Sequence, residues 1–171
     1  MVKLIGSILI LAGCMGALVC WEQRYKRRQR LAGDFIRMCA RWEYSLHMEH
    51  MRLFEFLEHY ETGEPQLDAF FRELLNELKK RQYPDGSRAW KETLAKYRRL
   101  FEPDADLWDI LWSADGIFFS VTTQESVRCA KVCRKRLEEY LTQASAEYLR
   151  KHKVYVPACM LGGAMIIILL I

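Results

Sequence analysis

Residues 130–148, AKVCRKRLEEYLTQASAEY, carry a long amphipathic pattern. Apolar side chains recur there at steps of mostly three and four positions, namely Ala130, Cys133, Leu137, Tyr140, Leu141, Ala144 and Tyr148. Such spacing places them on one face of an α-helix, whereas a half-buried strand alternates every second residue. The stretch therefore predicts a long helix that buries one face.

The same period recurs upstream, and no stretch shows a sustained two-residue alternation. The stripes are Leu31, Phe35, Met38, Trp42 and Leu46; Leu67, Phe70, Phe71, Leu74, Leu75 and Leu78; Trp90, Leu94, Tyr97 and Phe101; and Leu107, Ile110, Leu111, Ala114 and Ile117. Because each stripe fits one face of a helix, the fold class predicted for the middle of the chain is all-α.

Turn signals separate the stripes, at residues 62–65, 83–86 and 102–104. Pro65 suits the first turn of a helix, and Ser87 and Asp104 can cap the helices that follow their turns. Thr122 to Glu125 matches a capping box, which indicates a helix start near Val121. The pattern predicts a bundle of about five helices with short connections. Its first and last helices are expected to continue into the segments at the two ends.

Both ends of the chain are apolar. Residues 4–21 and residues 154–171 each form an uncharged run of 18 residues. As a helix, either run would span roughly 27 Å, close to the hydrocarbon thickness of a bilayer. The sequence thus predicts two transmembrane helices, with a helical domain at residues 22–153 between them.

Two basic collars flank that domain, at Arg24, Lys26, Arg27, Arg28 and Arg30 and at Arg150, Lys151 and Lys153. Membrane proteins concentrate Lys and Arg on the cytoplasmic side, so the collars predict a cytoplasmic middle domain in a multi-pass cell-membrane protein, in contact with membrane lipid. With Lys3 the collar segments carry a net +8, so the formal charge of +4 leaves residues 31–149 at −4. A slightly acidic domain argues against nucleic-acid binding.

Alternatives at the N-terminus stay open. Residues 11–14, Leu-Ala-Gly-Cys, resemble a bacterial lipoprotein processing site, in which Cys14 would be lipidated. Against this, the apolar run continues to Trp21. The glycines of the end segments, including Gly13, Gly16, Gly162 and Gly163, would let membrane helices approach closely and self-associate, or are the ordinary glycine content of such helices.

The chain shows no pattern typical of a catalytic or cofactor site. Its six cysteines form no Cys-x-x-Cys pair, and its glycines form no phosphate-binding loop. His47 and His50 share a helix face with Glu43, which leaves a metal-binding enzyme or sensor as an alternative, although a solvated face is the plainer interpretation. We therefore expect a protein that is not an enzyme and that holds no cofactor.

Two charged stretches are candidate partner contacts. The basic one comprises Arg128, Lys131, Arg134, Lys135 and Arg136, and the acidic one comprises Glu102, Asp104, Asp106 and Asp109. Each also has a plainer interpretation, as a solvated helix face for the basic stretch and as carboxylates at a helix N-terminus for the acidic one.

The whole chain resembles the stage III sporulation protein AB family. The resemblance is strongest at the ends, in Lys3-Leu4-Ile5-Gly6 and in the tail with Tyr155 and Leu161-Gly162-Gly163. Ala89-Trp90 and Leu94 resemble a family aromatic position, and residues 124–141 resemble its last long helix. The chain departs from the family at Trp112-Ser113, Gly116-Ile117 and Ser120, where the local turn or packing is expected to differ.

The resemblance implies a non-enzymatic component of the channel complex between mother cell and forespore. It also implies a helical domain similar to that of the inner-membrane platform protein of type II secretion systems. The partners it implies are a secretion-type ATPase and other membrane proteins of the complex, with the chain placed in the mother-cell membrane that faces the forespore.

Overall fold

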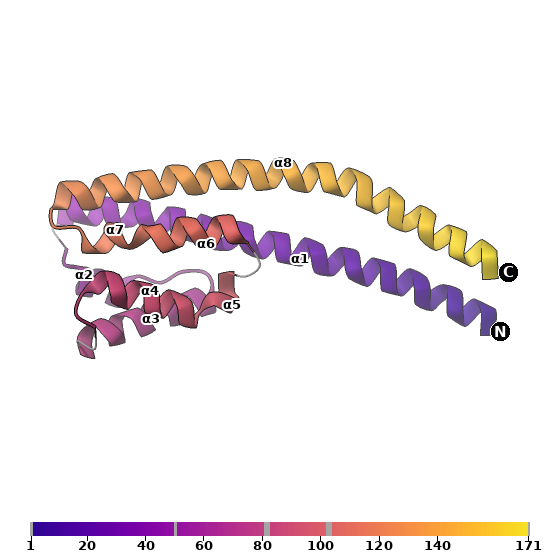
Figure 1. Cartoon of the computed structure of the whole chain (residues 1–171), viewed down its shortest axis with the longest axis horizontal. Coiled ribbons are helices and arrows are strands. Elements are labelled where there is room, and N and C mark those ends of the chain that lie inside the picture. The colour runs from indigo at the N-terminus through magenta and orange to yellow at the C-terminus, as the bar shows by residue number, and fades with distance from the viewer. Residues whose placement is uncertain (1, 50, 81–82, 102–103, 171) are drawn as a thin grey trace. The chain divides into compact units, whose positions relative to one another are not determined.

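The computed structural model describes residues 2–49, 51–80, 83–101 and 104–170. Within its helices, the side chains of residues 2–12, 14, 100, 101, 159, 160, 163, 164 and 166–170 lie outside this description. The described elements are all helical, which confirms the predicted fold class (Figure 1). Their bounds are α1 Val2–Tyr44, a π-helix Ser45–Glu49, α2 Leu53–His59, α3 Pro65–Lys80, α4 Gly86–Lys96, α5 Arg98–Phe101, α6 Ala105–Trp112, a 3-10 turn Ser113–Asp115, α7 Gly116–Phe119 and α8 Thr123–Leu170.

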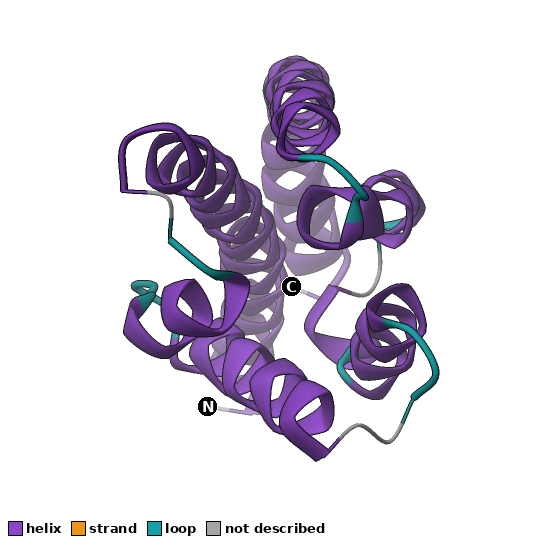
Figure 2. Ribbon diagram, turned by 90° about the vertical axis from the view of Figure 1, so that its left-hand side faces the viewer, coloured by secondary structure: helices purple, strands orange, loops and turns teal. Residues whose placement is uncertain are grey.

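The chain divides into two compact units. One unit holds residues 1–29 and 142–171, and the other holds residues 30–141. Helices α1 and α8 contribute residues to both units, as expected for helices that continue from the bundle into the end segments. We call residues 30–141 the bundle; its helices are joined by short loops (Figure 2).

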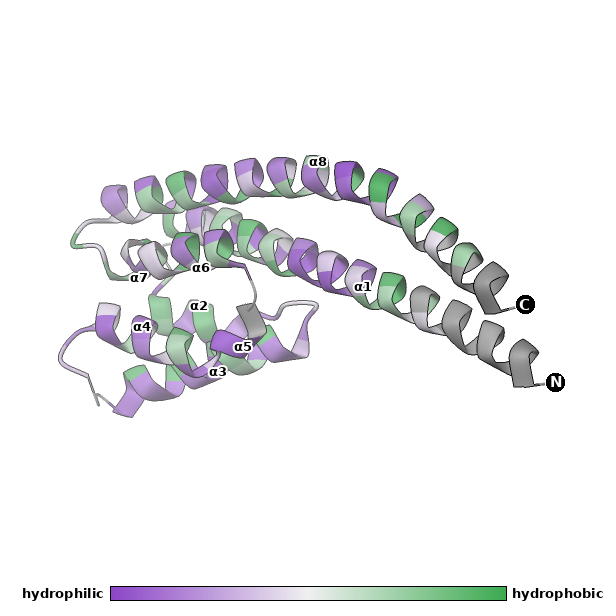
Figure 3. Cartoon of the chain, turned by 45° about the vertical axis from the view of Figure 1, so that its right-hand side comes forward, coloured by the Kyte–Doolittle hydropathy of each residue, from purple (hydrophilic) through white to green (hydrophobic). Residues whose placement is uncertain are grey.

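The bundle is built around aromatic side chains from five elements. Trp42 of α1 contacts Phe56 of α2 and Phe118 of α7, with ring centroids 4.8 and 5.4 Å apart. Trp90 of α4 contacts Phe118 at 5.7 Å and Phe70 of α3 at 5.4 Å. Each such buried ring contributes about 1.5–3 kcal/mol relative to exposure. Hydrophobic and hydrophilic residues are interspersed along α3, α4 and α8, as Figure 3 shows.

Most helix starts follow the local sequence signals. Pro65 begins α3, and the Asp104 carboxylate accepts from the amide of Leu107 at the start of α6 (3.3 Å). The Thr122 hydroxyl accepts from the amide of Glu125 (3.2 Å), and α8 begins one residue later. These three predictions are confirmed. The predicted Ser87 cap is wrong, because Asp85 caps α4 by accepting from Arg88 N at 2.6 Å.

The number of helices exceeds the expected count of about five. The described chain holds six helices of seven residues or more and two of four residues. No turn was expected between Leu46 and Thr62, yet α1 ends at Tyr44 and α2 begins at Leu53. The reason is tertiary: a straight helix would place Trp42 and Phe56 about 21 Å apart along its axis, whereas their rings are in contact.

Within the residues that were described, no helix is both long and apolar enough to cross a membrane. The two expected membrane segments, residues 4–21 and 154–171, fall largely on side chains outside the described set. The transmembrane prediction is therefore untested by the fold.

Candidate interaction surfaces

The basic stretch of α8 does not form one surface. Lys131 and Arg134 turn toward α1, where Lys131 Nζ lies 3.1 Å and Arg134 Nη1 lies 3.5 Å from the carboxylate of Glu43. The Glu43 side chain is only 20% exposed. Two of the five predicted contact residues thus hold α8 against α1 inside the bundle.

Arg128 and Arg136 lie on a different face of α8. Both line a pocket of about 250 Å³ between α8 and the end of α6 with the 3-10 turn that follows it. The Arg136 guanidinium donates to the Ser113 hydroxyl across this pocket (3.4 Å). Lys135 does not line the pocket and pairs with Glu139 at 3.8 Å. We call this pocket the α6–α8 groove; its lining residues are Ile110, Ser113, Ala114, Glu125, Arg128, Cys129, Val132, Cys133 and Arg136.

Two apolar side chains in or near the groove are exposed to solvent, whereas Ala114 of its lining is buried. Val132, which lines it, is 47% exposed, and Trp112, at the end of α6, is 40% exposed. Next to the groove, the chain of α7 packs tightly on α8, because a Cβ at Gly116 would lie 2.9 Å from the Sγ of Cys129. The groove therefore combines a closely packed apolar surface with cationic side chains along it. Sequence reasoning named Arg128 and Arg136 and missed the apolar residues between them.

The acidic stretch is also divided. Asp104 caps α6 and accepts a hydrogen bond from the Tyr140 hydroxyl of α8 (2.6 Å), so it links two helices. Asp106 and Asp109 are exposed on α6. Glu102 lies outside the described residues. The structure thus gives Asp104 a role within the fold, whereas Asp106 and Asp109 remain accessible.

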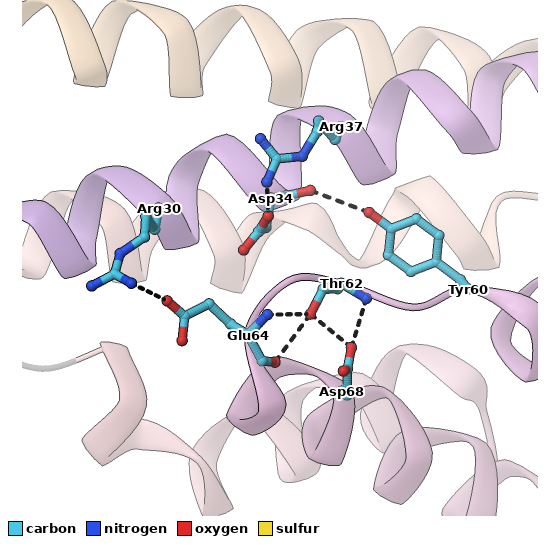
Figure 4. Close-up of polar contacts among 7 residues, drawn as sticks. All are labelled: Arg30, Asp34, Arg37, Tyr60, Thr62, Glu64 and Asp68. Carbon is cyan, nitrogen blue, oxygen red and sulfur yellow. Dashed lines mark hydrogen bonds and ion pairs between the residues drawn. The ribbon is translucent and has the colours of Figure 1, made fainter.

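A polar cluster that the sequence did not indicate joins α1 to the loop before α3 (Figure 4). Arg30 pairs with Glu64 at 3.2 Å, Arg37 pairs with the buried Asp34, and the Tyr60 hydroxyl donates to the Asp34 carbonyl at 3.4 Å. In the same loop, Thr62 donates twice to Asp68 at 2.7 Å. These contacts fix the loop against α1.

Burial shifts two pKa values in this cluster. It raises the pKa of Asp34 above its ordinary 3.8, an effect that the nearby Arg37 only partly offsets. It also raises the pKa of Tyr60 to about 12. A buried carboxyl with a raised pKa can mark a functional site, but here the side chain faces an arginine of its own helix and lines neither described pocket. We interpret the cluster as structural.

Two buried cysteines, Cys39 of α1 and Cys133 of α8, interact in the bundle. The interaction with Cys133, together with burial, raises the pKa of the Cys39 thiol. Both side chains pack in the core of the bundle.

The collar residues other than Arg30 lie in the other unit, together with an aromatic cluster. The Tyr148 ring of α8 stacks on Tyr25 at 4.0 Å and on Trp21 at 5.1 Å, both from α1, and Trp21 meets Tyr155 at 6.0 Å. Burial raises the pKa of Tyr25. These contacts join the two helices beside the apolar segments.

Several collar cations have partners. Lys26 pairs with Glu22 at 2.7 Å and Lys151 with Glu147 at 2.6 Å. Arg30 belongs to the bundle and pairs with Glu64, and Arg28 is half-buried. The exposed collar residues are Arg24, Lys26, Arg27, Arg30, Arg150 and Lys153.

The residues behind the two alternative functions are only partly described. Among the described residues, no group of three or more His, Cys, Asp and Glu side chains could hold a metal ion. His50 lies outside the described residues, and Glu43 is engaged by Lys131 and Arg134. The Cys14 side chain also lies outside the description.

Comparison with known proteins gives one match. The family model of stage III sporulation protein AB matches residues 3–171. No curated protein matches the chain, and no solved structure does. The match spans both apolar ends and the bundle.

Proposed function

Because the chain belongs to the stage III sporulation protein AB family, we propose that it is a non-enzymatic membrane component of the sporulation channel complex between mother cell and forespore. It acts there as a platform beside a secretion-type ATPase. The observation that carries the proposal is the family match over residues 3–171, which includes the bundle and both ends.

We propose that residues 4–21 and 154–171 anchor the protein in the membrane. Each run is uncharged over 18 residues and is followed or preceded by a basic collar on the side of the bundle. The positive-inside rule then places the bundle in the cytoplasm. The cluster of Trp21, Tyr25, Tyr148 and Tyr155 supports this arrangement, since Trp and Tyr are enriched at the membrane–water interface.

The proposed mechanism is architectural. The aromatic cluster ties α1 to α8 where the apolar segments begin, and within the bundle buried hydrogen bonds such as that from Trp90 Nε1 to the Leu111 carbonyl (3.0 Å) join its helices. A body of this kind presents fixed surfaces to other proteins of the complex. The surface that fits this role is the α6–α8 groove, which combines exposed apolar and cationic side chains.

A deletion strain complemented with a fluorescent fusion tests the function in a sporulating host. We expect synthesis in the mother cell, enrichment at the engulfing membrane and an arrest after engulfment when the gene is deleted. Normal spores in the deletion strain would overturn the proposal.

Protease protection in the same host tests the anchoring. In intact protoplasts the bundle should be protected from added protease, and in inverted vesicles it should be cleaved. Mass spectrometry of the intact N-terminus distinguishes a retained membrane helix from a lipoprotein anchor, because lipoprotein processing would remove residues 1–13.

A further inference from the structure

We infer that the α6–α8 groove binds a short acidic segment of another protein, with one apolar side chain seated over Val132 and a carboxylate at each of Arg128 and Arg136. The inference deepens the proposed function, since the partner would belong to the same complex. It commits to a protein segment and not to a lipid, a second copy of this chain or a small molecule.

The size of the groove favours a side chain over a whole ligand. Its volume is about 250 Å³, below the range of roughly 300–1,000 Å³ typical of small-molecule pockets. The apolar part is formed by Ile110, Ala114 and Val132, and Val132 is 47% exposed.

The positive charge of the groove favours an acidic partner segment. Arg128 and Arg136 are both exposed and line the groove, and a guanidinium binds a carboxylate in two-point geometry. Glu125 lines the same groove and precedes Arg128 in α8, whereas Arg136 follows Arg128. Carboxylates of the partner are therefore favoured at Arg128 and Arg136 and disfavoured beyond Arg128, beside Glu125.

The helix sets the spacing of the partner's residues. Arg128 and Arg136 are eight positions apart, which corresponds to about 12 Å along α8. An extended peptide covers about 3.3 Å per residue, so carboxylates roughly four positions apart would meet both arginines. Alternate side chains of an extended segment share a face, so the apolar residue falls midway between the two acids. The expected pattern is acid, any, apolar, any, acid.

Site-specific photo-crosslinking tests the inference in the full chain. A photoreactive amino acid replaces Val132 in the groove or, as a control, exposed Asn76 on α3. Expressed in the sporulating host, the Val132 probe should capture a peptide with the acid–apolar–acid pattern, identified by mass spectrometry. The Asn76 probe should not capture that peptide.

Charge reversal provides the matched comparison. Arg128→Glu with Arg136→Glu should reduce the yield of that cross-link by about tenfold or more, as expected for the loss of interface arginines. Lys80→Glu with Arg88→Glu makes the same change of charge at exposed sites on α3 and α4 and should leave the yield unchanged. Arg128→Lys with Arg136→Lys should retain part of it, because the charge remains while the two-point geometry is lost.

A binding measurement uses purified full-length protein and a dye-labelled peptide with two aspartates four positions apart and a leucine between them. Replacing the leucine by glycine, or both aspartates by lysine, should weaken binding by about tenfold or more. Equal binding of all three peptides would contradict the inference.

Other outcomes would also decide for or against the inference. Cross-links at Val132 only to lipid, to a second copy of this chain or to a basic segment would overturn the inference, as would a yield insensitive to reversal of both arginines. An arrest after engulfment in the deletion strain, together with no cross-link at Val132, would remove the groove and leave the proposed function standing. Normal spores in the deletion strain, together with selective peptide binding, would overturn the proposed function and leave the groove standing.

Discussion

Trp42 Nε1 donates a hydrogen bond to the Ile117 carbonyl at 2.9 Å, which connects α1 to α7 across the bundle. The same indole N–H lies 3.1 Å from the Ser126 hydroxyl, and that hydroxyl also donates to the Ile117 carbonyl. Three elements, α1, α7 and α8, therefore meet at one buried carbonyl. A buried polar group without such partners would cost about 1–3 kcal/mol.

Replacing Trp42 by phenylalanine should destabilise the protein by about 1–3 kcal/mol, through the lost hydrogen bond and the volume left by the smaller ring. Urea unfolding followed by circular dichroism measures the change. Trp112→Phe is the control, because that side chain is 40% exposed and makes no hydrogen bond across the core, so its effect should stay within about 0.5 kcal/mol. Equal effects at the two positions would contradict the assignment.

Glu43→Gln should cost about 1 kcal/mol or more, because Lys131 and Arg134 would then face an uncharged group in a partly buried setting. A double-mutant cycle with Lys131→Met should show coupling of about 0.5 kcal/mol or more. The control cycle uses Lys135 and Glu139, which are 78% and 59% exposed and lie 3.8 Å apart. That exposed pair should couple more weakly, and stronger coupling there than at Glu43 would refute the prediction.

Asp34 should make stability fall as pH rises. Its pKa in the fold is raised by burial above the ordinary 3.8, so the folded state binds more protons than the unfolded state in the interval above 3.8. Its contribution is full below about pH 3.8 and is lost as pH rises through the raised pKa. Asp34→Asn should remove this loss, so the variant gains stability relative to wild type between acidic and neutral pH.

Melting curves of both proteins from pH 4 to pH 7 measure this difference. Asp115 does not confuse the result: burial opposes its ionisation, but the Ser87 hydroxyl, Lys91 and the Gly116 amide lower its pKa below 3.8. Its contribution is present above 3.8 and is lost only as pH falls through that lower value. An Asn variant that loses stability toward pH 7 would show that the Asp34 carboxylate is stabilised by Arg37 more than it is penalised by burial.

Gly86→Ala should destabilise the protein by about 1–3 kcal/mol, because the added methyl group would overlap the ring of Phe119. Gly63→Ala is the matched control, since nothing lies within 4 Å of a Cβ there. Thermal unfolding of the two variants compares them directly. Similar melting temperatures would mean that Phe119 moves aside without cost.

Local signals predicted the features that depend on a few neighbouring residues. Pro65 begins α3, Asp104 caps α6 and Thr122 caps α8, because each of these residues acts on amides or backbone angles of its own helix. The Ser87 prediction failed by two positions for a tertiary reason. Its hydroxyl donates to Asp115, which leaves Asp85 to accept from the first turn of α4.

The break between α1 and α2 was not predictable in the same way. The apolar pattern runs on through Leu46, and the chain turns there because Phe56 packs against Trp42 and Phe118. The groove was also hidden, since Ile110 belongs to the apolar stripe of α6 and Val132 falls outside that of α8, and only the packing of α6 beside α8 brings the two together.

The sequence by itself determined the all-helical fold and the positions of most helix starts, because apolar periodicity and capping act within a few residues. It also carries the two uncharged end segments and their collars. Only the tertiary structure decided how the charges of α8 are used. Lys131 and Arg134 face Glu43 while Arg128 and Arg136 line an open groove, and the difference comes from which helix packs against each face, a property that no local pattern encodes.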